Sequence, residues 1–318
     1  MSVAAAESGV ILQRRGVLAA IGDYFWRRPG MLIFLMLLPA LLWLGIVYLG
    51  SLLALLLQSF FAIDEFSGVV DRSQLTLKTY AELLRPQNVD IIFRTVLMAA
   101  SVTVASAVIA FPIAYVAARY AKGYWKALFY LGVMLPLWAS YLVKIYAWKL
   151  ILAREGILNW VFEQLHLTWL LQAWLSIPVI GGNSLSISYT GTFLVFLYVW
   201  MPYMILPIQA AIERVPTNLL DASSDLGATP LQTFWKVIFP LALPGIVAGS
   251  IFTFSLTLGD YIIPQIVGNS QFFIGQAVYS HQGTAGNIPL AAAFTVVPIV
   301  IMVLYLWGAK RAGAFDAL

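Results

Sequence analysis

The chain has 318 residues, of which 61% are hydrophobic and only 10% are charged, with a formal net charge of +4 and no cysteine. Soluble globular domains carry about 25% charged residues, so this composition excludes an ordinary soluble protein and indicates a membrane protein. Without cysteine the chain has no disulfide framework, thiolate metal site or cysteine nucleophile, and its basic residues do not form the single patch typical of nucleic-acid binding.

Residues 1–30 are predicted to be a retained cytoplasmic segment. Four arginines precede the first apolar run, as in a signal peptide. However, residues 33–57 are too long for the apolar region of such a peptide and contain no small-residue cleavage site. Within the segment, residues 16–26 suit either a short interfacial helix with an aromatic edge or a disordered tail.

Six stretches are apolar over the roughly 20 residues that a helix needs to cross a bilayer. The polar connections near 60–90 and 153–189 are long, whereas the one at 119–124 is short. The sequence therefore predicts an all-α membrane protein with six transmembrane helices within residues 31–310, followed by a cytoplasmic tail at 311–318. The six predicted spans are 31–57, 91–118, 125–152, 190–211, 241–267 and 288–308.

Basic residues predict the direction of the spans, because the short loops of membrane proteins that carry more lysine and arginine stay on the cytoplasmic side. With the N-terminus inside, the outer connections hold only Arg72, Lys78, Arg85 and Arg154. Both termini and the connection at 213–240 are therefore predicted to lie in the cytoplasm. The cytoplasmic segments hold Arg14, Arg15, Arg27, Arg28, Arg119, Lys122, Lys126, Arg214, Lys236, Lys310 and Arg311.

Two features of the spans concern helix packing and shape. Gly245 and Gly249 form a Gly-x-x-x-Gly pair in the fifth span, and small residues recur along the second. Both patterns let helices approach closely. Every span also contains proline, which removes a backbone hydrogen bond and tends to kink a helix; whether the kinks serve shape alone or also motion stays open.

Residues 213–244 form a polar, capped segment between two apolar spans. An amphipathic run at 219–226 is followed by Gly227, a residue that can adopt the left-handed conformation that stops a helix. Where a membrane protein builds such a segment, a soluble partner is expected to dock on it.

A second helix is predicted directly after this stop. Thr229 can cap it, Pro230 suits its first turn, and Gln232 is placed to complete a capping box. Pro240 is predicted to close this helix as the chain re-enters the membrane. A helix, a tight turn and a second helix would form a short rigid element able to transmit force to the spans on either side.

The same segment resembles the EAA loop of ABC importer permeases. It reads Asp221-Ala222-Ser223-Ser224-Asp225-Leu226-Gly227-Ala228 and is followed by an apolar stretch that ends in Phe239-Pro240. In that family the loop forms coupling helices that fit a groove on the cytoplasmic ATPase subunit. Here aspartate replaces the usual glutamate at 221 and serine replaces the second alanine at 223, which puts the strength of docking in question. The residues expected to couple to the ATPase are Asp221, Ala222, Ser223, Asp225, Gly227, Thr229 and Pro230.

The resemblance, which covers roughly residues 30–310, implies a non-catalytic permease subunit in a bacterial inner membrane. ATP and Mg²⁺ would be bound by two copies of a partner ATPase, since this chain lacks the Gly-x-x-x-x-Gly-Lys-Ser/Thr phosphate loop. A second permease subunit, expected to be a related chain, and an extracytoplasmic substrate-binding protein are the other implied partners. The outer connections at 60–90 and 153–189 are the expected docking surface for that binding protein. No cofactor and no nucleic acid are expected on this chain.

Further stretches are similar to spermidine/putrescine permeases in particular. Polyamines are therefore the expected substrates. Sulfate, iron, opine and phosphonate permeases share much of this architecture and remain alternatives. The stretches are Leu135–Trp148, Gly156–Asn159 and Leu258–Gly268, with Ile274-Gly275 and Pro289–Ala293 downstream.

Charged residues inside the membrane are costly and usually face a partner or a water-filled path. Asp260, followed by Tyr261, is suited to hold an organic cation by charge pairing and cation–π contact, but a structural ion pair with Lys144 or Arg94 is an equal alternative. Lys144 leaves an anionic substrate possible, whereas Arg94 suits a local pair with Asp90, four residues earlier. The residues expected along a substrate pathway are Asp260, Tyr261, Trp138, Tyr141, Lys144 and Tyr203.

Two other classes of membrane protein fit the sequence less well. A secondary transporter or channel predicts several coupled intramembrane carboxylates or inverted repeats, and the sequence contains neither. A membrane-embedded enzyme needs a clustered site, whereas His166 and His281 are isolated and have no metal-ligand spacing around them.

Overall fold

The computed structural model describes residues 26–64 and 68–311. These residues are mainly helical, with one short antiparallel strand pair, β1 (Ala62–Ile63) and β2 (Val70–Asp71). The chain divides into two compact units, Met1–Leu57 and Gln58–Leu318. Except for Trp26, the predicted interfacial helix at 16–26 lies outside the described residues, and so does the predicted tail apart from Arg311.

The first unit contains one long apolar helix, which confirms the first predicted span. α2 (Pro29–Leu42), the π-helical η1 (Trp43–Leu49) and α3 (Gly50–Gln58) follow one another as a 30-residue candidate span. At 1.5 Å per residue this helix is about 45 Å long, enough to cross a hydrocarbon core of about 30 Å. Within this unit none of the helix's side chains is buried.

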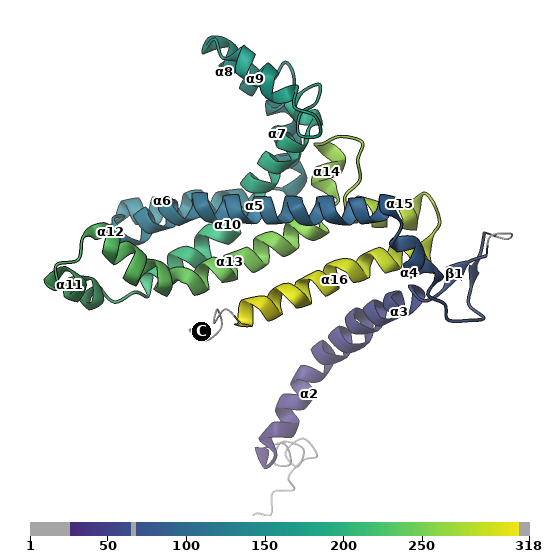
Figure 1. The fold of residues 1–318 in the computed structure, drawn as a ribbon. Coiled ribbons are helices and arrows are strands. Elements are labelled where there is room, and N and C mark those ends of the chain that lie inside the picture. The colour runs from purple at the N-terminus through teal and green to yellow at the C-terminus, as the bar shows by residue number, and fades with distance from the viewer. Residues whose placement is uncertain (1–25, 65–67, 312–318) are drawn as a thin grey trace, which may run out of the picture. The chain divides into compact units, whose positions relative to one another are not determined.

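The second unit is a bundle of long apolar helices with shorter elements at its two ends, and α7 (Tyr141–Ile151), α8 (Ile157–Gln164) and α9 (Thr168–Leu175) project from its side (Figure 1). One end of the bundle holds α11 (Thr217–Asp225) and α12 (Pro230–Thr233), and the other holds α4 (Lys78–Leu83) and α15 (Ile274–Gly283). The four long helices are α5 (Pro86–Arg119), α10 (Tyr189–Glu213), α13 (Phe239–Gly259) and α16 (Ile288–Arg311). The shorter elements are α4 (Lys78–Leu83), α6 (Tyr124–Trp138), α7 (Tyr141–Ile151), α8 (Ile157–Gln164), α9 (Thr168–Leu175), η2 (Leu185–Ile187), α11 (Thr217–Asp225), α12 (Pro230–Thr233), η3 (Phe234–Ile238), α14 (Ile262–Ile266) and α15 (Ile274–Gly283).

The directions of these helices show which segments cross the bundle. α5 and α10 both end near α11. Arg119, the last residue of α5, donates a hydrogen bond from Nη2 to the carbonyl oxygen of Val215 at 3.0 Å, and Val215 lies between the end of α10 and the start of α11. α6 starts at that same end, where Lys126 Nζ lies 2.9 Å from Glu213 Oε1. α10 itself starts at the opposite end. The chain therefore crosses the bundle between the start of α6 and the start of α10, and the apolar α6–α7 pair makes that crossing.

The third predicted span, 125–152, is not one helix, which corrects the prediction. α6 and α7 meet at an angle of 96°, because the backbones of Ala139 and Ser140 are extended. The carbonyl oxygen of Pro136, which loses its helical partner at this break, accepts a hydrogen bond from Lys144 Nζ at 2.8 Å. Within the described residues, the six predicted spans therefore correspond to five long apolar helices and one bent pair.

The fifth predicted span, 241–267, begins and ends earlier than expected. One helix runs from Pro230 to Gly259 through α12, η3 and α13. Pro240 does not close the helix before it, because the widened π-helical turn η3 leaves room for a ring that would clash inside a regular helix. At the other end the chain leaves the helix at Asp260, whose backbone is extended. The element that begins at Pro230 is thus continuous with a membrane-crossing helix.

Gly245 and Gly249 allow α10 and α13 to pack closely, as predicted. A Cβ atom on Gly245 would lie 2.5 Å from both the Cβ of Ala211 and the carbonyl oxygen of Pro207. A Cβ atom on Gly249 would lie 2.8 Å from Sδ of Met204. Glycine at these positions therefore sets the distance between the two helices.

Gly245→Ala is expected to destabilise the protein by about 1–3 kcal/mol, because the added methyl group meets Ala211 and the backbone of α10. Gly308→Ala in α16 is the matched control, since nothing lies within 4 Å of its Cβ position. Thermal unfolding of the detergent-purified variants measures the difference. Equal unfolding midpoints for the two variants would contradict the close packing of α10 on α13.

Candidate functional site

The predicted coupling segment contains a tight turn at Gly227. The amide of Ala228 donates to the carbonyl oxygen of Ser223 at 3.0 Å, and the amide of Gly227 donates to that of Ser224 at 2.9 Å. This pair of bonds is a Schellman motif, the arrangement that ends a helix at a residue in the left-handed conformation. Gly227 has a φ of +74°, so the predicted stop is confirmed.

The predicted capping box opens the next helix. Thr229 Oγ1 accepts from the amide of Gln232 at 3.4 Å, and Gln232 Oε1 accepts from the amide of Thr229 at 2.9 Å. The hydroxyl groups of Ser223 and Thr233 lie 2.8 Å apart and join α11 to α12. The two helices therefore form one compact element at the start of the helix that continues into α13.

The surface of this element combines polar and large apolar side chains. Leu226 is 87% exposed, Leu231 is 68% exposed and Trp235 is 56% exposed. Of the predicted coupling residues, Ser223 is half-buried, and the exposed ones are Asp221, Ala222, Asp225, Gly227, Thr229 and Pro230.

A second group of predicted residues meets where α13 ends. Asp260 Oδ1 accepts from the amides of Ile262 at 2.7 Å and Ile263 at 3.0 Å, so the carboxylate caps α14. Asp260 Oδ2 accepts a hydrogen bond from the hydroxyl of Tyr141 on α7. Asp260 therefore joins the bent α6–α7 pair to the point where α13 stops.

Aromatic rings adjoin this carboxylate. The ring of Tyr141 stacks on Trp200 with centroids 5.9 Å apart and an interplanar angle of 22°. Trp200 in turn contacts Tyr203 at 5.8 Å, and Tyr203 contacts Phe252 at 6.4 Å. The arrangement places one carboxylate at the edge of a continuous set of rings.

Asp260 forms neither of the ion pairs that the sequence allowed. Lys144 donates to the carbonyl oxygen of Pro136. Arg94 pairs with Asp90, as predicted for the local alternative, and also donates to the carbonyl oxygen of Phe272 at 3.2 Å. Within the described residues, no lysine or arginine lies within salt-bridge distance of Asp260.

The structure brings together only part of the predicted pathway. Asp260, Tyr141 and Tyr203 belong to the carboxylate–aromatic cluster just described. Trp138 is 80% exposed at the end of α6 and makes no ring contact within the described residues. Tyr261, although next to Asp260 in the sequence, stacks on Tyr279 at 5.2 Å.

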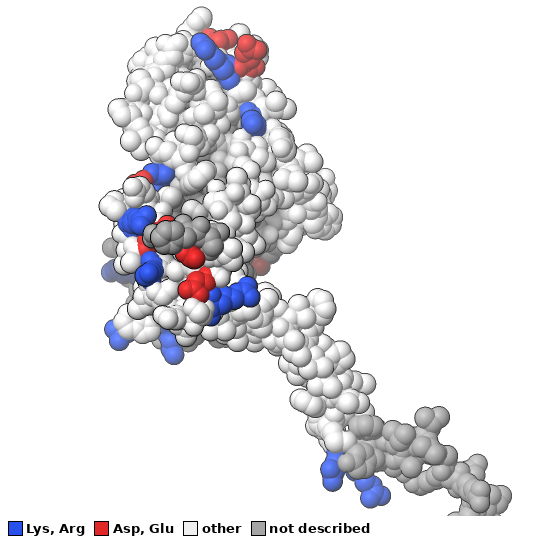
Figure 2. All heavy atoms as spheres, turned by 90° about the vertical axis from the view of Figure 1, so that its right-hand side faces the viewer, with Lys and Arg blue, Asp and Glu red and all other residues white. Residues whose placement is uncertain are grey.

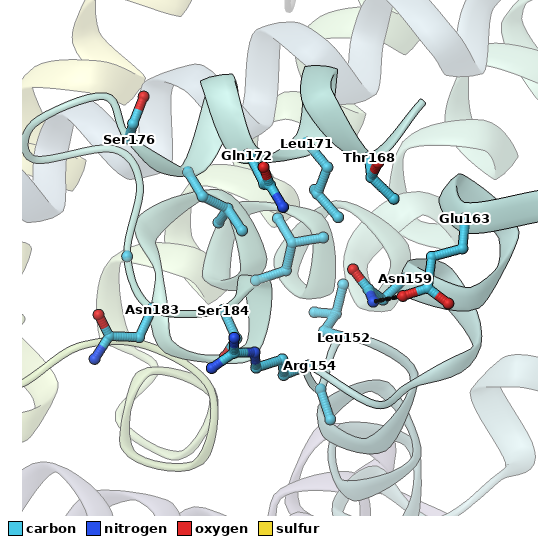
Figure 3. Close-up of a pocket in the computed structure, with 14 residues that line it drawn as sticks. Leu152, Arg154, Asn159, Glu163, Thr168, Leu171, Gln172, Ser176, Asn183 and Ser184 are labelled. Carbon is cyan, nitrogen blue, oxygen red and sulfur yellow. Dashed lines mark hydrogen bonds between the residues drawn. The ribbon is translucent and has the colours of Figure 1, made fainter. Parts of the chain in front are cut away.

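Two polar pockets lie in the connections that were predicted to be outside the membrane. One, of about 550 Å³, lies between α8, α9 and the loop before η2, and Arg154, Gln172 and Asn183 line it (Figure 3). The other, of about 800 Å³, is lined by Asp71 and Lys78 among others. Seen from the end that holds α4 and α15, most of the surface is uncharged and the charged side chains form small mixed groups (Figure 2).

Sequence reasoning missed a polar cluster near the coupling segment. Glu213 Oε1 accepts from Lys126 Nζ at 2.9 Å, from the Tyr130 hydroxyl at 3.1 Å and from Gln209 Nε2 at 3.1 Å. The only signal available was the spacing of four residues between Gln209 and Glu213 and between Lys126 and Tyr130, which places each pair on one helix face. That spacing does not reveal that the two faces meet.

The described residues contain no group of metal-ligating side chains. His281 stacks on Phe294 with centroids 5.8 Å apart, and burial lowers the pKa of its imidazole below the usual value. This histidine therefore packs as part of the apolar contact between α15 and α16.

Known proteins resemble this chain over most of its length. The model of the binding-protein-dependent transport system inner membrane component family matches residues 95–311. The inner membrane ABC transporter permease protein YdcU of Escherichia coli is 58% identical over 301 residues, covering 95% of this chain and 96% of the relative. The spermidine/putrescine transport system permease protein PotB of Haemophilus influenzae is 29% identical over 285 residues, covering 88% of this chain and 90% of the relative.

Solved structures share the fold. A chain of a bacterial alginate ABC transporter, in complex with its alginate-bound periplasmic protein, matches with a TM-score of 0.70 and 15% identity, covering 93% of this chain and 97% of that one. A chain of the MetNI methionine ABC transporter in an inward-facing conformation matches with a TM-score of 0.54 and 17% identity, covering 74% of this chain and 99% of that one.

Proposed function

The chain belongs to the family of binding-protein-dependent transport system inner membrane components, and from this premise we propose that it admits polyamines such as spermidine and putrescine. As an ABC importer permease it is a membrane subunit rather than a catalyst. The energy for transport would come from ATP and Mg²⁺ bound by two copies of a partner ATPase. An extracytoplasmic binding protein would deliver the substrate, and a second, related permease chain would complete the pathway.

The coupling segment at 213–240 is the proposed contact with the ATPase. It offers two acidic side chains, Asp221 and Asp225, together with the exposed Leu226 and Leu231. A surface of this kind suits a groove with an apolar floor and a basic rim. This assignment places the segment, the N-terminus and the C-terminus in the cytoplasm, in agreement with the distribution of basic residues.

The observation that carries the polyamine proposal is the carboxylate of Asp260 beside the rings of Tyr141, Trp200 and Tyr203. In residues 26–64 and 68–311, no lysine or arginine forms a salt bridge with this carboxylate. An ammonium group gains from both the charge and the ring faces. The resemblance to PotB, a spermidine/putrescine permease, supports the same class of substrate.

The alternative substrates differ in charge. Sulfate and phosphonates are anions, and a site for them needs a free cation. Lys144 is the residue for which the sequence left an anionic substrate possible. Its Nζ donates instead to the carbonyl oxygen of Pro136. The charge at the cluster thus favours a cationic over an anionic substrate.

The test is uptake by proteoliposomes that hold the complete complex, with the binding protein supplied on the outer side. We expect ATP-dependent uptake of radiolabelled spermidine or putrescine. Sulfate, ferric iron, an opine and a phosphonate, measured in parallel, should show no uptake above the ATP-free background. Transport of one of these four in place of a polyamine would refute the substrate, and uptake without ATP would refute the mechanism.

A further inference from the structure

The carboxylate of Glu213 receives three hydrogen bonds at the junction between α10 and the coupling segment. Lys126 and Tyr130 donate from one face of α6, and Gln209 donates from the preceding turn of α10 itself. All three donors reach the same oxygen, Oε1. The bond from Gln209 orients the carboxylate, and the bonds from α6 attach that helix to the last residue of α10.

A second contact joins the same junction to α5. Arg119, in the last turn of α5, donates to the carbonyl oxygen of Val215 at 3.0 Å. Val215 is buried, and only Pro216 separates it from the start of α11. The short connection into α11 is therefore fixed both to α5 and to α6, although neither helix is adjacent to it in the sequence.

α6 leads directly to the carboxylate–aromatic cluster. It is followed after the 96° bend by α7, whose first residue, Tyr141, donates to Asp260. A movement of the start of α6 must therefore shift either the bend at Ala139 and Ser140 or the contact between Tyr141 and Asp260. Coupling between distant sites is carried by such rigid elements when they can adopt two arrangements.

We propose that Glu213 and Lys126 form a latch that makes the coupling segment and the α6–α7 pair move together during the ATP cycle. This latch rests on the transport function proposed above, in which Glu213 and Lys126 position the coupling segment relative to α6. The latch lies at the surface of the bundle, where the side chains of Glu213 and Lys126 are 29% and 39% exposed.

The distance between the two elements tests the latch without any knowledge of the substrate. Because this chain has no cysteine, spin labels can be placed at Asn218→Cys in α11 and Tyr124→Cys in α6, both of which are exposed positions. In the assembled complex, the label distance is expected to be the same without nucleotide and with ATP and vanadate. In the Glu213→Gln variant it should change between the two states. A distance that changes in the parent protein, or that stays constant in the variant, overturns the latch.

A charge swap separates the latch from a general loss of structure. Tyr130 and Gln209 can each accept as well as donate, so the double variant Glu213→Lys, Lys126→Glu should restore the constant distance that Glu213→Lys alone loses. The matched control is Lys310→Gln, which removes an exposed charge in the last turn of α16, and it should behave as the parent. Failure of the swap to restore the distance counts against the latch.

Transport adds an independent readout. In Glu213→Gln we expect spermidine uptake per ATP hydrolysed to fall about tenfold, as loss of a charge-assisted hydrogen bond worth about 1.4 kcal/mol would produce. An unchanged ratio overturns the latch. Absence of polyamine uptake in the parent protein counts against the proposed substrate, while the label distances still decide the latch.

Discussion

Gly227→Val is expected to reduce ATP-dependent uptake at least tenfold, whereas Gly227→Asn should retain most of it. Valine in the left-handed conformation costs about 1–2 kcal/mol, which asparagine largely avoids by local hydrogen bonding. Nothing lies within 4 Å of a Cβ atom placed on Gly227, so the cost comes from the backbone and not from a clash within the chain. The valine variant should open the Schellman turn and misalign α11 and α12.

The two substitutions at Gly227 are matched because valine and asparagine are similar in size. Both add a comparable side chain to an exposed position, and they differ mainly in their tolerance of a φ of +74°. Co-purification of the ATPase subunit and uptake should fall together in the valine variant. If both variants lose the ATPase equally, the added side chain disrupts docking directly; if neither does, residues 213–240 are not the coupling surface.

Asp260→Asn is expected to raise the KM for polyamine uptake about tenfold or more, because a hydrogen bond to a charged group contributes about 1.5–3 kcal/mol. The remaining amide oxygen can still accept from Ile262 and Ile263, so assembly of the complex should be unchanged. Tyr141→Phe is the matched comparison: it keeps the carboxylate and the stacked ring but removes the hydroxyl that donates to Asp260.

Asp260→Ala separates binding from capping. It removes both the charge and the acceptor for the two amides of α14, and loss of such a cap costs about 0.5–2 kcal/mol. If Asp260 acts on the substrate, the asparagine and alanine variants should both lose uptake, and the alanine variant should also lose thermal stability. Normal uptake by the asparagine variant with a defective alanine variant would assign Asp260 to structure alone.

Features that depend on neighbouring residues were predictable from the sequence. The helices near 31–57, 190–211 and 288–308 follow from apolar length, because a bilayer selects for length and hydropathy alone. The turn at Gly227 follows from bonds that span at most five residues along the chain. The ion pair between Arg94 and Asp90 was predictable in the same way, because the two residues are four apart in the sequence.

Features that depend on residues distant in the sequence were not predictable from it. The bend at Ala139 is stabilised by Lys144, whose side chain was expected to serve a substrate or an ion pair. Pro240 was expected to end a helix, but the π-helical turn before it lets the helix continue. A proline that ends a helix and a proline inside a helix that continues look the same in the local sequence. The surrounding structure decides whether the helix ends.

The sequence alone determined that this protein is an all-α membrane protein, that residues 213–240 form a capped polar element, and that its motif resembles ABC importer permeases. Only the tertiary structure decided which charges meet. Tyr141 reaches Asp260 across 119 residues of sequence, and Tyr130 reaches Glu213 across 83. Hydropathy and capping act within a few residues, whereas a contact between helices depends on how the whole bundle packs.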